Sequence, residues 1–224
     1  MLILAFESSA KPVSVAVCSD GELLGLYFQN NEFSHSRTLL ALAESLLNNL
    51  GLEPADIGLV AVASGPGSFT GVRIGVSAAK GLAWGLDIPV CGVSTLEAMA
   101  YQTPGPGVII CPVMDARRDQ VYNALFEWRE DALVRLCDDR AISLVDLADD
   151  LRNYDSPCLL VGDGVAVCKN FEALSYCRAA PELMRYQTAY GVALAAMNAK
   201  PIPAAELEPC YLRPSQAERE RANT

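Results

Sequence analysis

The segment from Gly65 to Gly75 holds the residues of this chain best suited to bind an anion. It reads GPGSFTGVRIG, follows an apolar run over residues 58–64 that predicts a buried strand, and leads into a predicted helix over residues 70–85. Where a helix begins at such a turn, its first backbone N–H groups are free and carry partial positive charge. This arrangement suits a phosphate or a carboxylate. The residues expected to contact the anion are Gly65, Gly67, Ser68 and Thr70.

The spacing of these glycines matches neither of two common phosphate-binding loops. A Walker loop would end in Gly-Lys-Ser/Thr, and in the pattern G-x-G-x-x-G the third glycine would come one residue earlier. A second interpretation is open, because glycines also let a chain turn sharply and let a helix pack closely on a sheet. The segment is therefore either an anion site or a structural turn.

Length and composition indicate one large domain or two small ones. The chain has 224 residues, 51% of them hydrophobic, and no apolar run approaches the ~20 residues that span a bilayer. The start, MLILAF, has no basic segment before it and meets Glu7 at once, so we expect a strand and not a signal peptide. The eight cysteines form no Cys-x-x-Cys pair, and most lie in apolar segments. This usage is typical of reduced thiols, so we expect a cytoplasmic protein without membrane contact.

The net charge and the single histidine limit the kinds of ligand. Seventeen basic and twenty-seven acidic residues give 17 − 27 = −10. A surface of this charge repels phosphate backbones, so direct nucleic-acid binding would need a basic groove from another subunit. His35 is the only histidine, and no cluster of His, Cys, Asp and Glu offers the three or four ligands of a catalytic metal. We therefore expect no metal site.

The order of predicted elements suggests that one α/β unit occurs twice. Each half is expected to contain three strands, a helix, a further strand and a further helix, and the Pro/Gly-rich break at residues 103–107 separates the halves. We predict an N-terminal subdomain over residues 1–104, a C-terminal subdomain over 105–214 and a flexible tail over 215–224. The residues themselves show no clear repeat, so the duplication is one of pattern.

Apolar periodicity, caps and turn signals give the element boundaries. In the first half the predicted strands are 2–7, 13–19, 22–28, 58–64 and 88–93, and the predicted helices are 34–50, ended by Gly51, then 70–85, and one opened by a capping box of Ser94 and Glu97. In the second half the predicted strands are 108–114, 120–128, 132–137 and 157–161, and the predicted helices are 143–153, capped by Ser143, then 165–174 and 181–199.

Several motifs, taken in order along the chain, resemble a known family. Besides the glycine segment, they are LILAFESS from Leu2, HSR from His35, GVSTL from Gly92, MDAR from Met114 and EPCYLR from Glu208. Together they span nearly the whole chain and resemble the bacterial TsaB (YeaZ) family, accessory proteins for tRNA threonylcarbamoyladenosine synthesis. The resemblance implies the α/β fold of actin-like proteins, sugar kinases and Hsp70-type ATPases, which is built from two such three-strand units.

The resemblance implies a partner protein that is not itself an enzyme. The family's catalytic relative moves a threonylcarbamoyl group onto N6 of the adenosine next to the tRNA anticodon, and it binds a metal through two histidines four residues apart. With His35 alone, this chain cannot form that pair, so we expect no catalytic residues. The implied partners are the catalytic transferase subunit, an ATPase subunit of the same pathway and, when the chain is alone, a second copy of itself. It would meet tRNA only through the complex.

The same fold implies a place for a nucleotide. In its members the first hairpin and the glycine turn hold phosphates, and a carboxylate at the end of the first strand orients metal and water. Here that carboxylate is Glu7, where relatives typically carry Asp, and the longer side chain moves it by about one bond length. Ser8 and Ser9 follow and can donate hydrogen bonds to an anion. We expect a vestigial site with no tightly bound cofactor, and ATP or ADP only within a complex; the alternative function is a small-molecule kinase or ATPase.

The resemblance also favours partner contact through the helices at 34–50 and 70–85. Small residues on the second helix would let a partner backbone approach closely. The other interpretation is that both helices only cover their own sheet. Replacement of Gly75 or Ala78 by glutamate is predicted to abolish complex formation and to leave the monomer folded. The residues expected at the interface are His35, Arg37, Leu40, Leu47, Gly71, Arg73, Gly75, Ala78, Ala79 and Leu82.

Overall fold

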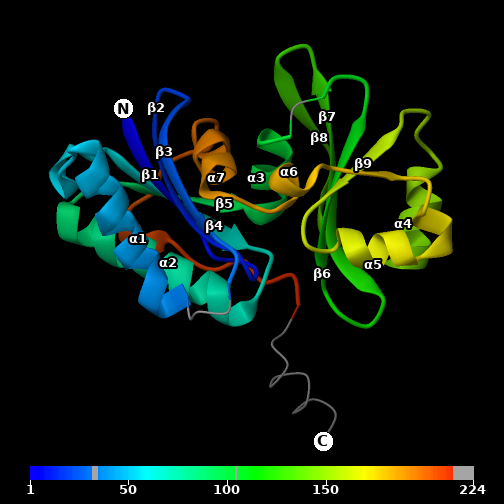
Figure 1. Cartoon of the computed structure of the whole chain (residues 1–224), viewed down its shortest axis with the longest axis horizontal. Coiled ribbons are helices and arrows are strands. Elements are labelled where there is room, and N and C mark those ends of the chain that lie inside the picture. The colour runs from blue at the N-terminus through cyan, green and yellow to red at the C-terminus, as the bar shows by residue number, and fades with distance from the viewer. Residues whose placement is uncertain (32–34, 104, 214–224) are drawn as a thin grey trace, which may run out of the picture.

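The computed structural model describes residues 1–31, 35–103 and 105–213, without the side chain of Leu183. They form two lobes, each built on a five-stranded sheet with helices packed against it (Figure 1). The predicted tail over 215–224 lies outside the described residues, as do Ser34 at the predicted start of the first helix and Pro104 at the predicted boundary. The division of the chain into subdomains at residue 104 remains a prediction.

The first sheet has the strand order β3-β2-β1-β4-β5. β1 pairs antiparallel with β2 and parallel with β4, and β5 is parallel to β4. The central strands are apolar on both faces because helices cover both faces. The bounds are β1 Leu2–Glu7, β2 Val13–Ser19, β3 Glu22–Gln29, β4 Leu59–Gly65 and β5 Val90–Ser94.

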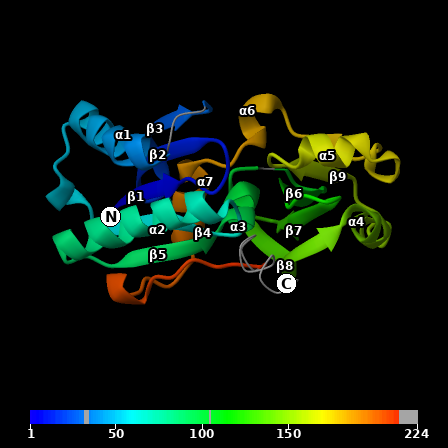
Figure 2. The ribbon, with the colours of Figure 1, turned by 90° about the horizontal axis from the view of Figure 1, so that it is seen from below.

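Three helices enclose the first sheet. Helices α1 (His35–Leu50) and α2 (Phe69–Leu86) lie side by side on one face, and α7 (Ala189–Ala196) covers the other (Figures 1 and 2). Gly51 follows α1 with φ +67°, so it ends that helix as predicted. In the part of the chain that the structure describes, no helix combines the length and the apolar character needed to cross a membrane.

The second sheet repeats the strand order of the first. Read from its opposite edge, the order is β8-β7-β6-β9-β10, so β6 takes the place of β1 and β9 the place of β4. The predicted duplication of one α/β unit is therefore confirmed. The bounds are β6 Ile109–Asp115, β7 Gln120–Arg129, β8 Ala132–Ser143, β9 Cys158–Val161, β10 Arg178–Ala179, α4 Leu144–Leu151 and α5 Val165–Asn170.

Two predicted helices of the second half are wrong in extent. The helix predicted at 181–199 is two helices, α6 (Glu182–Arg185) and α7, because Thr188 is extended and caps α7 with its side-chain oxygen. The helix predicted at 165–174 is α5 followed by the 3₁₀ turn Glu172–Leu174. In addition, β8 continues six residues beyond the predicted Cys137 to Ser143, and the short edge strand β10 was not predicted.

Helix α3 (Thr95–Tyr101) lies between the lobes and packs in an apolar cluster with β6 and β7. Ser94 caps it, since its Oγ accepts a hydrogen bond from Glu97 N at 3.2 Å. The second half of the predicted capping box is wrong, because the Glu97 carboxylate pairs with Arg135 of β8 at 2.9 Å. Glu97 thus links the two lobes.

Candidate functional site

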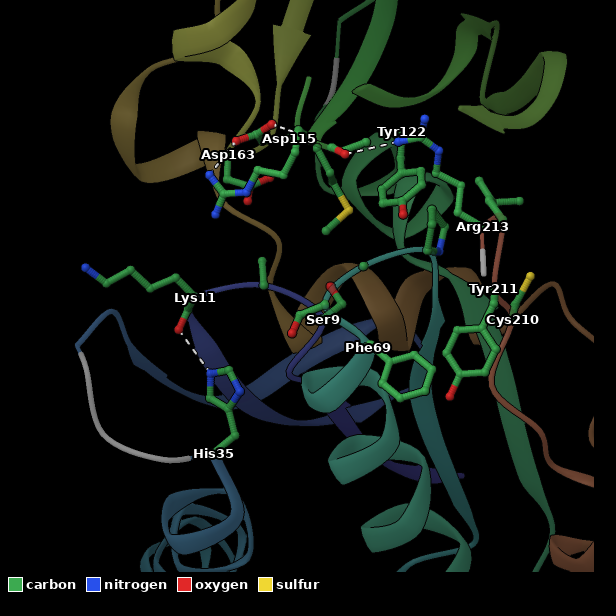
Figure 3. Close-up of a pocket in the computed structure, with 18 residues that line it drawn as sticks. Ser9, Lys11, His35, Phe69, Asp115, Tyr122, Asp163, Cys210, Tyr211 and Arg213 are labelled. Atoms are coloured by element: carbon green, nitrogen blue, oxygen red, sulfur yellow. Dashed lines mark hydrogen bonds and ion pairs between the residues drawn. The ribbon is translucent and has the colours of Figure 1, made fainter. Parts of the chain in front are cut away.

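A cavity of about 570 Å³ lies between the two lobes (Figure 3). The first lobe contributes the β1–β2 turn and the start of α2, and the second contributes the β6–β7 hairpin and the turn after β9. His35 of α1 and residues 210–213 complete the lining. The cavity therefore lies beyond the carboxyl ends of β1, β4, β6 and β9, which is where open α/β folds bind ligands.

The glycines of the turn pack directly against other backbone segments of the chain. A Cβ added at any of three glycines would lie far inside van der Waals distance of a carbonyl oxygen, so only glycine fits there. Those oxygens occupy the space beside the glycines and would repel an anion. The contacts support the structural interpretation of the turn. The distance from the added Cβ to the nearest carbonyl oxygen would be 2.2 Å at Gly65 (to Cys210 O), 2.4 Å at Gly67 (to Ser9 O) and 2.1 Å at Gly71 (to Ser8 O).

The start of α2 is capped by the chain itself. Ser68 Oγ accepts a hydrogen bond from Gly71 N at 3.3 Å, and Ser68 N donates to Ser9 O at 2.6 Å. Of the predicted anion contacts, the structure brings Ser9, Gly67 and Ser68 to the cavity wall. The lining does not include Glu7, Ser8, Gly65 or Thr70, all of which the structure describes.

Glu7 is fully buried at the end of β1. Its Oε1 accepts a hydrogen bond from Ser9 N at 2.6 Å, whereas Oε2 has no partner among the described residues. Burial raises the pKa of Glu7 from 4.5 to about 7, and the hydrogen bonding with Ser9 partly opposes this shift. A carboxyl group behind the cavity wall, and partly protonated near neutral pH, is poorly suited to orient a metal and water.

Sequence reasoning missed Asp163, which lies after β9 and lines the cavity with Asp115 (Figure 3). Burial raises the pKa of Asp163 to about 6, and repulsion from the Asp115 carboxylate adds to the shift. Asp115 ends β6 as Glu7 ends β1. The available signal was an acidic residue between two glycines at the end of a predicted strand. The floor of the cavity is thus acidic, which disfavours a bare phosphate.

Two arginine side chains that line the cavity already have partners in the chain. Arg117 pairs with Asp115, with 3.1 Å between Nη1 and Oδ2. Arg213 donates to Ala116 O at 3.1 Å and also to the side chain of Gln120. An incoming anion would have to compete with these contacts.

His35 ties α1 to the β1–β2 turn. Its Nε2 lies 3.1 Å from Lys11 O at the edge of the cavity (Figure 3). The histidine therefore contacts backbone within its own lobe. Across the described ranges, no group of three His, Cys, Asp or Glu side chains is arranged to hold a metal ion.

The residues predicted at a partner interface divide into two groups. Gly71, Gly75 and Ala79 of α2, with Leu47 of α1, are buried against the first sheet. A Cβ at Gly75 would lie 2.5 Å from Ser8 Oγ. This corrects the prediction that these small residues admit a partner, because they bring α2 close to its own sheet. The predicted residues that reach the surface, wholly or in part, are His35, Arg37, Leu40, Arg73, Ala78 and Leu82.

A shallow groove of about 150 Å³ lies between α1 and α2, and Leu40 and Leu82 line it. Leu40 is 52% exposed, and Trp84 of α2, which sequence reasoning missed, is 67% exposed. Trp84 lies beside the buried residue Ala83, outside the buried stripe of α2, so helical periodicity could have identified it. Trp84 lies beside Pro201 and Ile202, away from this groove, so Leu40 and Leu82 are the apolar side chains that meet there. Exposed apolar side chains that lie together are typical of association surfaces.

This chain is similar in sequence to proteins that are already known. Residues 29–205 match the sequence model for TsaD, tRNA N6-adenosine threonylcarbamoyltransferase. A Bacillus subtilis protein called tRNA threonylcarbamoyladenosine biosynthesis protein TsaB is 37% identical over 75% of this chain and 74% of its own length. The Haemophilus influenzae protein of the same name is 30% identical over 95% of this chain and 94% of its own length.

Solved structures agree on the fold. YeaZ from Pseudomonas aeruginosa superposes with a TM-score of 0.77 at 23% identity, covering 94% of this chain and 99% of that one. ROK hexokinase from Thermus thermophilus superposes with a TM-score of 0.51 at 13% identity, covering 88% of this chain and 98% of that one. The predicted fold of actin-like proteins and sugar kinases is confirmed.

Proposed function

The chain belongs to the TsaB (YeaZ) family and takes part in tRNA threonylcarbamoyladenosine biosynthesis, and we propose that it does so as a non-catalytic subunit. In this role it binds the catalytic transferase subunit and supports its activity. The observation that carries the proposal is the surface formed by Arg37 and Leu40 of α1 with Ala78 and Leu82 of α2, here called the α1–α2 face.

The chemistry of the α1–α2 face supports docking. Leu40 exposes a large apolar side chain beside Leu82, and burial of such side chains is a main source of binding energy in interface centres. Arg37 is exposed on the same helix as Leu40 and adds a hydrogen-bonding rim. The same face would serve the partner ATPase subunit, or a second copy of this chain when the transferase is absent.

The residues of the cavity support a role without catalysis. One histidine in the whole sequence cannot supply a two-histidine metal site. Glu7, the carboxylate that the fold would use in hydrolysis, is buried, hydrogen-bonded to Ser9 N and outside the cavity lining. Contact with tRNA would come through the complex, because a net charge of −10 repels a nucleic acid.

The second candidate function is that of a small-molecule kinase or ATPase, which the interlobe cavity favours. The cavity residues fit a nucleotide poorly, since carbonyl oxygens fill the glycine turn and two carboxylates lie on the floor. We therefore propose that no cofactor binds the isolated chain tightly and that ATP or ADP binds only within a complex. A phosphate-release assay on the isolated chain distinguishes the two functions, because sustained turnover would favour the kinase or ATPase.

Substitution of Leu40 by glutamate tests the α1–α2 face. The Leu40→Glu variant is expected to bind the transferase subunit of the same organism about 100-fold more weakly, because a charge would be buried in an apolar contact. The matched control is Val145→Glu on α4, where the side chain is 56% exposed on the second lobe. Its affinity is expected to equal that of the unsubstituted chain. Isothermal titration calorimetry measures both.

Two results would contradict the proposal at different levels. If Leu40→Glu and the unsubstituted chain bound the transferase with equal affinity, the docking surface would lie elsewhere than on α1 and α2. A reconstituted reaction in which the transferase and ATPase modify tRNA equally well without this chain would reject the accessory role itself. Circular dichroism of both variants checks that the fold is retained.

A further inference from the structure

Residues 202–213, here called the strap, run along the first lobe and end on the second (Figure 2). Ile202 exchanges two backbone hydrogen bonds of 2.9 Å with Val90 of β5. Lys80 Nζ of α2 donates to two strap carbonyl oxygens at 2.8 and 3.2 Å. Leu207 is buried in the core beneath α1 and α2. Most of the strap is thus an integral part of the first lobe.

The strap is held to the first lobe up to Tyr211. Cys210 N donates to Ser64 O at 2.7 Å. The Tyr211 ring stacks on Phe69 with 4.9 Å between centroids, and its hydroxyl accepts a hydrogen bond from Arg73 Nε at 2.7 Å. The Arg73 guanidinium also lies 3.8 Å over the Phe69 ring.

Arg213, two residues later, is attached to the second lobe. Its guanidinium donates to Ala116 O at 3.1 Å and to the side chain of Gln120, both in the β6–β7 hairpin. Residues 210–213 all line the interlobe cavity. Four consecutive residues therefore line the cavity and join the two lobes, with one end fixed to each.

The two covalent connections between the lobes are tied to each other. The chain passes from α3 to β6 and returns from β10 to α7. Gln102 Nε2 donates to Tyr186 O at 2.6 Å, and Thr188 Oγ1 donates to Gln102 Oε1 at 2.6 Å. These paired connections provide a hinge about which the lobes can rotate.

Several polar atoms beside the interlobe cavity lack a close hydrogen bond. Among the described residues, they include Glu7 Oε2, Ser9 Oγ, Asp163 Oδ1 and the amide of Gln187. Glu7 interacts with Ser9, and Asp163 with Gln187, at longer range. Water that enters a wider cavity can form hydrogen bonds with these atoms, which favours opening.

We propose that residues 210–213 are a latch across the interlobe cavity that acts beside the Glu97–Arg135 ion pair in holding the lobes together, and that release of Arg213 from the β6–β7 hairpin widens the cavity. The first-lobe contacts of Cys210 and Tyr211 keep the latch in place, so Arg213 alone can detach and return. This inference does not depend on the proposed accessory function, because it concerns the two lobes of one chain.

Amide hydrogen exchange of the Arg213→Ala variant, followed by NMR, tests the latch. The Ser9 amide donates to Glu7 within the first lobe, and because Ser9 lines the interlobe cavity, its exchange reports entry of water into the cavity. The Cys210 amide reports the strap. Loss of the Arg213 contacts is expected to speed exchange of the Ser9 amide about tenfold. The matched control is Arg117→Ala, which removes a guanidinium that pairs within its own hairpin and is expected to leave both amides unchanged.

Small-angle X-ray scattering of the same samples provides a second readout, with a larger radius of gyration expected for Arg213→Ala only. Unchanged exchange at Ser9 in Arg213→Ala would overturn the proposal, whether or not the Cys210 amide exchanges faster. Equal acceleration in Arg117→Ala would overturn it as well, since the effect would then belong to the hairpin and not to the strap. A circular dichroism spectrum matching the unsubstituted chain confirms that both lobes remain folded.

Discussion

Replacement of Gly71 by alanine is expected to lower the free energy of unfolding by about 3 kcal/mol. The new Cβ would lie 2.1 Å from Ser8 O, which is backbone and cannot rotate away. Relief requires α2 to move from β1, which would loosen the core beneath Val72 and Val76. Urea unfolding followed by circular dichroism measures the loss.

Gly81, ten residues further along α2, offers the matched control. It is exposed, and a Cβ there would meet nothing within 4 Å. Gly81→Ala is therefore expected to stabilise the protein by about 0.5–1 kcal/mol, because alanine has the higher helix propensity. Similar free energies for the two variants would show that close approach of α2 to β1 does not limit stability.

These packing distances also change the test of partner binding. Gly75 lies one turn after Gly71, and its Cβ position is 2.5 Å from Ser8 Oγ. Glutamate at Gly75 would disrupt the contact between α2 and its sheet, so loss of binding by that variant would reflect misfolding. Ala78 is partly exposed and Leu40 more so, which makes them the informative positions.

Much of the fold could be predicted because local signals and tertiary packing agree. The apolar stripe of α1, closed by Gly51 in a left-handed conformation, fixes a helix that also fits the first sheet. Prediction was wrong where a distant partner decides the outcome. The Glu97 carboxylate turns to Arg135, 38 residues away, and leaves the capping box half made. No local pattern contains that information.

The candidate site was harder to predict because its residues depend on how the two lobes meet. Asp163 is 48 residues from Asp115 in sequence, yet the duplicated sheets bring both to one cavity. The small residues of α2 were also ambiguous. A helix needs small side chains both where it packs closely on a partner and where it packs closely on its own sheet, so the sequence fits either arrangement. Only the position of Ser8 relative to Gly71 and Gly75 decides between them.

Replacement of Glu7 by glutamine is expected to make the protein more stable at pH 8 and to flatten its pH dependence. The pKa of Glu7 is about 7 in the folded protein against 4.5 in the unfolded chain, so the folded state binds more protons between these values. The stabilising contribution is complete below pH 4.5 and is lost as pH rises through 7. A shift of this size corresponds to about 3 kcal/mol, and glutamine, which does not ionise, avoids the loss.

Free energies of unfolding at pH 5 and pH 8 measure this effect. The difference between Glu7→Gln and the unsubstituted protein is expected to grow by about 2–3 kcal/mol from pH 5 to pH 8. Asp163, whose pKa is also raised by burial, is present in both proteins, and because its charge helps to raise the pKa of Glu7, the difference reports Glu7 together with this coupling. Glu44→Gln on the exposed side of α1 is the control and is expected to show no such growth. A constant difference across this range would mean that the Glu7 carboxyl reaches water or a partner when ionised, and the argument that it cannot serve hydrolysis in the cavity would lose its basis.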